Sequence, residues 1–108
     1  VEDCVDAILL GAERSPGPVS IYNVGSEDRI GVIRIAEVVS EEMGLRNVNV
    51  RIVGGPGGRG WTGDVKVMQL DVSRIKGLGW RPRLGSEGAV RRAARELLGE
   101  GRNNFQYN

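Results

Sequence analysis

The chain has 108 residues, enough for one domain with a single core, and its 40% hydrophobic and 27% charged residues are ordinary for a soluble globular protein. The net charge of +1 predicts no general attraction to nucleic acid, and no apolar run approaches the about 20 residues that cross a bilayer. One cysteine and no histidine exclude an internal disulfide, a zinc-type ligand cluster and any Ser-His or Cys-His nucleophile pair, so a reducing cytoplasm fits best.

The first half of the chain alternates between predicted helix and predicted strand. The opening helix has an apolar stripe at helical spacing, formed by Val5, Ile8, Leu9 and Ala12. Asp3 stands where an N-cap would accept amide hydrogen bonds. Residues 19–25, "VSIYNVG", are rich in β-branched and aromatic side chains, which predicts a strand. A second amphipathic helix is expected from Val32 to Met43, with Gly44 as its stop signal.

The second half contains two further predicted strands separated by a glycine-rich stretch. Residues 48–53 alternate apolar and polar side chains, and residues 65–71 are again extended in pattern. Asp71 and Ser73 are expected to cap a short helix that runs through Ile75. A last helix is predicted from Ser86 to about Leu98, with arginines 91, 92 and 95 on its polar face.

These elements predict an α/β fold, a small lobe with few short strands and about four helices rather than a complete doubly wound sheet. Residues 1–100 form the expected domain, and residues 101–108 form a polar, frayed tail. The sequence does not begin with methionine and opens directly on a helix start. We therefore expect it to be a piece of a longer protein.

The stretch "GGPGGRGWTGD", residues 54–64, spells G-x-G-x-x-G but does not predict a dinucleotide site. Such a turn must lead into a helix, whereas the residues after Gly60 have the pattern of a strand. No P-loop pattern is present either. Two interpretations remain open: Trp61 packs into the core while Arg59 pairs with a carboxylate, or Arg59 meets an anionic ligand that Trp61 covers.

Four motifs, in their order and spacing, resemble the C-terminal lobe of the extended short-chain dehydrogenase/reductases. The similarity is to the NAD-dependent nucleotide-sugar epimerases and dehydratases of the UDP-glucose 4-epimerase type, and it covers the chain to about Glu100. The motifs are Y-N-x-G at residues 22–25, G-D at 63–64, D-x-S-[KR] at 71–74 and L-G-W-x-P at 78–82.

The resemblance implies that catalysis lies outside this chain. In that family an N-terminal Rossmann domain holds the NAD and the Tyr-x-x-x-Lys pair, and this sequence contains neither the pair nor a dinucleotide turn that meets its conditions. The chain then supplies no catalytic residue and no metal ligand, needs no cofactor of its own, and is inactive alone, although the intact protein would be an enzyme that uses NAD.

The resemblance also assigns the binding residues of a nucleotide-diphosphate sugar. An arginine before G-D contacts the diphosphate in that family, and the acid hydrogen-bonds the ribose or orients the arginine; these roles fall on Arg59 and Asp64. The frequent family spacing is Arg-x-Gly-Asp, but Trp61 occupies the arginine position here. Trp61 therefore joins the candidate substrate-binding set through stacking or packing.

Two functions follow as alternatives. The first is the sugar-nucleotide-binding portion of a cytoplasmic epimerase or dehydratase, partnered by its own Rossmann domain, with no nucleic-acid or membrane partner. The second is a stand-alone, non-catalytic module that self-associates, and a homodimer stays open in both. Other motif residues are expected to be structural: Asn23 and Asp71 in local hydrogen bonds, Trp80 in the core, and the arginine-rich helix face in solvent or at a domain interface.

Overall fold

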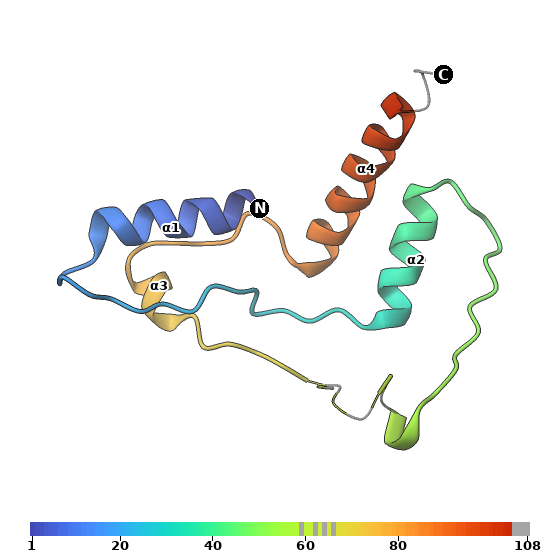
Figure 1. Cartoon of the computed structure of the whole chain (residues 1–108), viewed down its shortest axis with the longest axis horizontal. Helices are drawn as coiled ribbons and strands as arrows, with labels where there is room; N and C mark the ends of the chain where they lie inside the picture. Colours follow the sequence, from blue (N-terminus) through green and yellow to red (C-terminus); the bar gives the residue numbers. More distant parts are fainter. Residues whose placement is uncertain (59, 62, 64, 66, 105–108) are drawn as a thin grey trace. The chain divides into compact units, whose positions relative to one another are not determined.

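The computed structural model of the chain describes residues 1–58, 60, 61, 63, 65 and 67–104. The chain divides into two compact units, Val1–Asp28 with Gly55–Leu84 and Arg29–Gly54 with Gly85–Asn108. No described helix combines the length and apolarity of a membrane span. In chain order the helices are α1 (Glu2–Arg14), α2 (Val32–Glu42), the 3₁₀ turn η1 (Pro56–Gly58), α3 (Ser73–Gly77) and α4 (Ser86–Asn104) (Figure 1).

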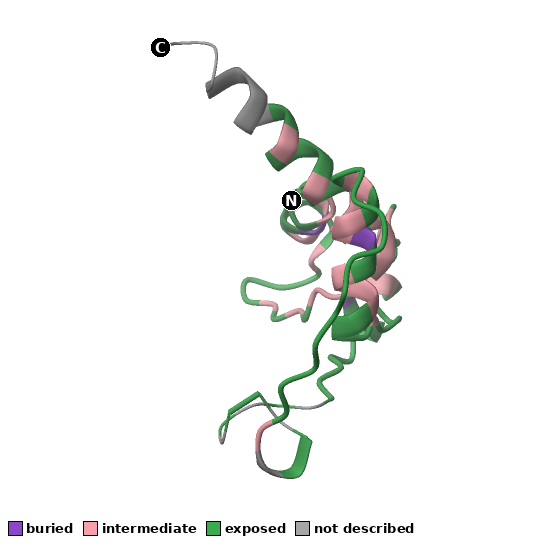
Figure 2. Cartoon of the chain, turned by 90° about the vertical axis from the view of Figure 1, so that its right-hand side faces the viewer, coloured by how far each residue is buried: buried purple, intermediate pink, exposed green. Residues whose placement is uncertain are grey.

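The predicted α/β fold is wrong, because the described residues contain helices and no β-strand. Strands exist only where backbone N–H and C=O groups bond to a neighbouring strand. Residues 19–25, 48–53 and 65–71 have the side chains of strands, but their described parts are not paired in a ladder. Residues 48–54 are exposed along their whole length, and Val50 keeps 43% of its surface in solvent (Figure 2).

Side-chain amides replace the missing ladder in the first unit. The Asn23 Nδ2 group donates to the backbone oxygen of Asp71 at 3.1 Å, and the Gln69 Nε2 group donates to that of Glu27 at 2.7 Å. The Lys76 ammonium also pairs with the Glu27 carboxylate at 2.6 Å. Two extended stretches thus run beside each other without forming a sheet.

The core of the first unit lies where α1, α3 and the segment after α3 meet. It consists of Ala7, Val72, Ile75 and Trp80. The predicted apolar stripe of α1 is exposed instead, with Ile8 at 69% and Leu9 at 64% of their accessible surface. The stripe prediction was wrong because α1 turns its small residue, Ala7, toward the core, where a short side chain permits close packing.

Asp3 ties α1 to the segment after α3. Its backbone oxygen accepts the indole N–H of Trp80 at 3.0 Å, and its carboxylate accepts the backbone N–H groups of Arg83 at 3.0 Å and Leu84 at 3.4 Å. The amide of Arg83 is the main reason that the pKa of Asp3 is lowered. The expectation of an N-cap is corrected here, since Val1 occupies that position and Asp3 lies inside the helix.

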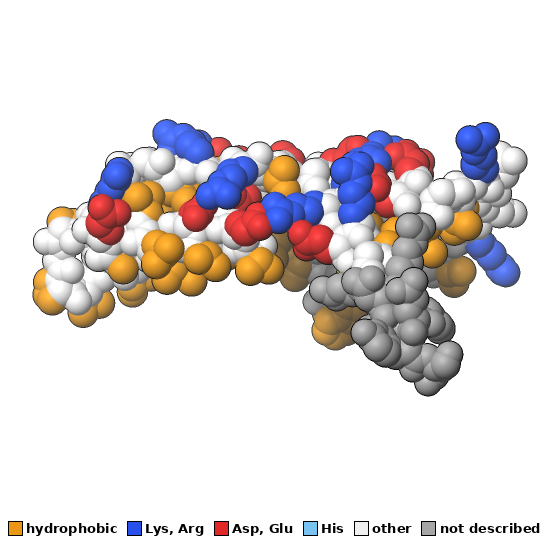
Figure 3. Space-filling view, turned by 90° about the horizontal axis from the view of Figure 1, so that it is seen from above, with side chains coloured by type: hydrophobic (Ala, Val, Ile, Leu, Met, Phe, Trp, Pro, Cys, Tyr) orange, Lys and Arg blue, Asp and Glu red, His pale blue; other side chains and the backbone are white. Residues whose placement is uncertain are grey.

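Ion pairs between α2 and α4 organise the second unit. The Arg34 guanidinium bonds to the Glu87 carboxylate at 2.8 Å, and Arg91 bonds to Glu42 at 2.7 Å and to Glu41 at 2.8 Å. The Glu42 side chain is only 9% exposed, whereas most of the others lie open to solvent, and Figure 3 shows arginines and carboxylates side by side. α4 ends at Asn104, six residues beyond the predicted end at Leu98.

Acid should weaken this helix pair. Arg34 and then Arg91 lower the pKa of Glu87 from its ordinary value near 4.5 to about 2, and the pKa values of Glu41 and Glu42 are lowered by Arg91 and Arg95 respectively. Carboxylates with lowered pKa values stabilise the folded state above the unfolded pKa, and that stability is lost as pH falls toward the folded value. The helix content measured by circular dichroism at 222 nm should therefore fall as the pH is lowered from about 5 to about 2. Helicity that is constant over this window would contradict the role given to the ion pairs.

Truncating the core should destabilise the first unit. Ile75 is 1% exposed, so Ile75→Ala removes buried methyl groups and should lower the free energy of unfolding by about 2–5 kcal/mol. Met68→Ala, at a side chain that is 76% exposed, is the matched control and should change it by less than about 0.5 kcal/mol. Urea denaturation of both variants makes the comparison, and equal losses would mean that this core is not the one that holds the unit.

Candidate functional site

The glycine-rich stretch contains one 3₁₀ turn whose conformation requires glycine. Gly57 and Gly58 have φ angles of 66° and 69°, and the N–H of Gly58 bonds to the backbone oxygen of Gly55 at 3.1 Å. Residues with a Cβ rarely adopt such angles, so the turn depends on its glycines. Arg59 and Asp64, two of the three candidate binding residues, lie outside the described residues.

Trp61 is the candidate residue that the structure describes, and it does not lie in the core. Its side chain is 68% exposed. The six-membered part of its indole rests on the backbone of Gly63, because a Cβ built on Gly63 would come within 2.3 Å of Cη2 and 2.4 Å of Cζ3 of Trp61. The interpretation in which Trp61 packs into the core is therefore wrong.

The glycine run does not fit the pyrophosphate of NAD. A dinucleotide turn holds phosphate on the free N–H groups of the helix that starts inside it. Among the described residues after Gly58, the next α-helix is α3, which begins only at Ser73 and has five residues. This stretch therefore offers no helix N-terminus to a dinucleotide.

The motif residues outside the loop have structural contacts. Asp71 accepts the N–H of Ser73, the first residue of α3, at 2.9 Å, so it bonds the start of the helix, although Val72 and not Asp71 holds the N-cap position. Trp80 is 4% exposed, which confirms its place in the core. The Asn23 bond to Asp71 joins residues far apart in sequence, so the expected local turn bond was wrong.

The backbone conformation at Gly79 explains why the second residue of the L-G-W-x-P motif is glycine. Gly79 has a φ angle of 103°, and a Cβ there would lie 3.3 Å from Nη1 of Arg14. That guanidinium donates to the backbone oxygen of Leu78 at 3.1 Å. Glycine at 79 thus lets the chain turn tightly between α3 and the buried Trp80.

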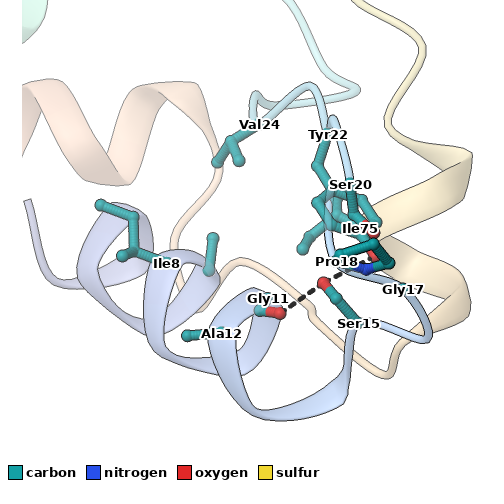
Figure 4. Close-up of a pocket in the computed structure, with 11 residues that line it drawn as sticks. Ile8, Gly11, Ala12, Ser15, Gly17, Pro18, Ser20, Tyr22, Val24 and Ile75 are labelled. Atoms are coloured by element: carbon teal, nitrogen blue, oxygen red, sulfur yellow. Dashed lines mark hydrogen bonds between the residues drawn. The ribbon is translucent and has the colours of Figure 1, made fainter.

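A hydroxyl-lined pocket at the end of α1 was not identified from the sequence. The hydroxyls of Ser15 and Tyr22 lie 3.0 Å apart, and the Arg74 guanidinium carbon lies 5.7 Å from the centre of the Tyr22 ring. The pocket encloses about 500 Å³, and Figure 4 shows α1 on one side and the segment with Ser20 and Tyr22 on the other. The sequence signal for this pocket was the hydroxyl residues around the "SPGP" turn. Such residues also occur in ordinary turns, so they do not by themselves indicate a pocket.

Arginines 91, 92 and 95 of α4 are engaged by carboxylates of the second unit. Arg91 and Arg95 share Glu42, and Arg92 pairs with Glu96 within α4 at 2.8 Å. In the first unit Arg83 pairs with Asp6. Each of these guanidinium groups already has a carboxylate partner within its own unit, and these contacts favour the interpretation of a structural face.

Comparison with solved structures finds a substantial likeness. The chain is similar to a crystal structure of UDP-galactose 4-epimerase, with 37% identical residues and a TM-score of 0.75. The similarity covers 92% of this chain and 32% of that protein, so the chain spans about a third of its length. No family model and no curated protein matches the chain. The chain thus has the fold of part of an epimerase.

Substitution at Gly79 should test the conformational argument for the motif. Gly79→Ala forces a Cβ into a left-handed backbone beside Arg14 and should lower stability by about 1–2 kcal/mol. Gly77→Ala is the matched control, because a Cβ at Gly77 meets nothing within 4 Å and its φ lies outside the left-handed range. Thermal unfolding followed by circular dichroism compares the two variants. A Gly79→Ala protein as stable as Gly77→Ala would show that the turn tolerates a side chain.

Proposed function

We propose that the chain is the sugar-nucleotide-binding portion of an NAD-dependent nucleotide-sugar epimerase or dehydratase of the extended short-chain dehydrogenase/reductase type. The observation that carries the proposal is the likeness to UDP-galactose 4-epimerase, at 37% identity over 92% of the chain. The Y-N-x-G, G-D, D-x-S-[KR] and L-G-W-x-P motifs also support it. In this proposal the chain is the C-terminal lobe, and the protein is cytoplasmic.

The glycine-rich stretch is the proposed ligand-binding segment. Arg59 neutralises the diphosphate of the sugar nucleotide, and Asp64 hydrogen-bonds the ribose or orients the arginine. Hydrogen bonds to charged groups contribute roughly 1.5–3 kcal/mol each, so Arg59 would supply a large part of the affinity. The exposed Trp61 and the glycine conformations at 57 and 58 support a ligand role, because neither is used to build the core.

The redox chemistry belongs to another part of the intact protein in this proposal. The sequence lacks Tyr-x-x-x-Lys, and among the described residues its G-x-G-x-x-G run does not lead into a helix, so in this proposal the chain supplies no catalytic group. The intact enzyme would oxidise the sugar at C4 to a keto intermediate, and an N-terminal Rossmann domain would hold the NAD that takes the hydride. The contribution of this chain is to bind the nucleotide and so to position the sugar.

The exposed apolar side chains favour a second candidate function, a self-associating module without catalysis. Ile8 and Leu9 on α1 and Leu97 on α4 each keep more than 60% of their surface in solvent. Apolar surface of this kind is normally covered by a partner. In the first proposal the partner is the rest of the enzyme, and in the second it is another copy. Sedimentation of the chain together with a nucleotide titration separates the two.

Arg59→Ala should remove most of the affinity for a nucleotide diphosphate. UDP, GDP, dTDP and their sugars added to the chain should shift the amide resonances from Gly57 to Asp64, and the loss of a charge-assisted bond should weaken binding by about 10- to 150-fold. Arg51→Ala, at an exposed arginine outside the stretch, is the matched control and should bind as the parent chain does. Shifts that persist unchanged in Arg59→Ala would show that this side chain does not bind the diphosphate.

A further inference from the structure

The contact between Trp61 and Gly63 forms a supported aromatic surface. One face of the indole lies against the Gly63 backbone, so closely that a Cβ at that position would overlap the six-membered ring. Gly63 therefore supports the ring as its seat, by which we mean the backbone surface on which the indole lies, and any side chain at this position would push the indole away. The backbone conformation of Gly63 does not itself require glycine, because its φ lies outside the left-handed range. The contact with Trp61 is therefore the structural reason for glycine at this position of the G-D motif.

The rest of the indole remains open to solvent. Trp61 keeps 68% of its surface exposed, whereas Trp80 keeps 4% and donates its indole N–H to Asp3. Exposing a large apolar ring to water is unfavourable, so covering it with a ligand is favourable. A ring that already lies against the backbone also loses little conformational entropy when a flat ligand covers it. Such a surface suits a planar partner that stacks on its free face.

We propose that Trp61, seated on Gly63, stacks on the nucleobase of the sugar nucleotide. The inference rests on the proposed function and adds which part of the ligand the ring contacts. The indole is uncharged and cannot neutralise a diphosphate, so it does not replace the arginine that the family places at this position. A nucleobase is the flat aromatic part of the ligand, and base stacking on aromatic side chains tolerates any base.

The two tryptophans allow a direct test within one molecule. The chain has two indole N–H resonances, and Trp80 serves as an internal reference because its ring is buried and its N–H is bonded to the backbone oxygen of Asp3. The probes are uridine, which has a base and no phosphate, galactose 1-phosphate, which has phosphate and no base, and UDP. We expect uridine and UDP to shift the Trp61 indole resonance, galactose 1-phosphate to leave it in place, and Trp80 to stay fixed throughout.

Substitutions test the ring and its seat separately. Trp61→Ala should weaken UDP binding by about 5- to 150-fold, the range that loss of one stacked base produces, and Trp61→Phe should retain binding within about threefold. Gly63→Ala should behave like Trp61→Ala because its Cβ displaces the ring. Gly77→Ala is the matched control, since it lies outside the glycine-rich stretch, a Cβ there meets nothing within 4 Å and its φ is outside the left-handed range.

The outcomes separate this inference from the proposed function. If UDP shifts the amides of residues 54–63 while the Trp61 indole stays unmoved, the chain binds nucleotide and the stacking proposal is overturned. A Trp61 shift with galactose 1-phosphate but not with uridine would also overturn it, because the ring would then contact the sugar. If no ligand shifts any resonance, the proposed function fails and the stacking proposal fails with it.

Discussion

Extended backbone forms a sheet only where its amide and carbonyl groups pair with a neighbouring strand, and this constraint governs what the chain builds. Three stretches have the composition of strands, yet their described residues are not paired. The first unit is held instead by a small core around Ile75 and Trp80 and by the backbone bonds of Asp3. The second is held by ion pairs between α2 and α4.

The same constraint explains the large apolar surface. Alternating valines and isoleucines that would face a core from a sheet are left in solvent when the sheet does not form, as at Ile52 and Val67. The likeness covers 32% of UDP-galactose 4-epimerase. In the proposed function, the remainder of such an enzyme packs against the apolar side chains that are exposed here. The proposed function divides binding and catalysis in the same way, because the chain holds the proposed nucleotide-binding residues and its sequence lacks Tyr-x-x-x-Lys.

Helices could be predicted from the sequence because their signals are local. The period of apolar residues and the stop at Gly44 placed α2 to within one residue, and the pair Asp71 and Ser73 marked the start of α3, although Val72 holds its N-cap position. The strands could not, since pairing depends on distant backbone and not on the β-branched residues themselves. The inward face of α1 was also mispredicted, because the sequence does not reveal that close packing beside Trp80 favours Ala7 over its larger neighbours.

The sequence predicted which residue types could form the candidate site, but not the contacts between them. An arginine, a tryptophan and an aspartate in a glycine-rich stretch suggested an anionic ligand, and the motif spacing suggested which ligand. The contact between Trp61 and Gly63 could not be inferred, since no sequence pattern indicates that an indole approaches the backbone two residues further on. Tyr22 in its hydroxyl-lined pocket went unnoticed for the same reason: Ser15 and Tyr22 meet only because the turn after α1 folds back.

Saturation-transfer NMR from the protein to UDP-galactose tests the central claim most directly, because it reports from the ligand which of its atoms the chain touches. The account predicts transfer that is strongest at the uracil protons, weaker at the ribose and least at the galactose. Equal transfer to all three parts, or transfer confined to the galactose, would contradict the claim that this chain binds the nucleotide half of such a ligand.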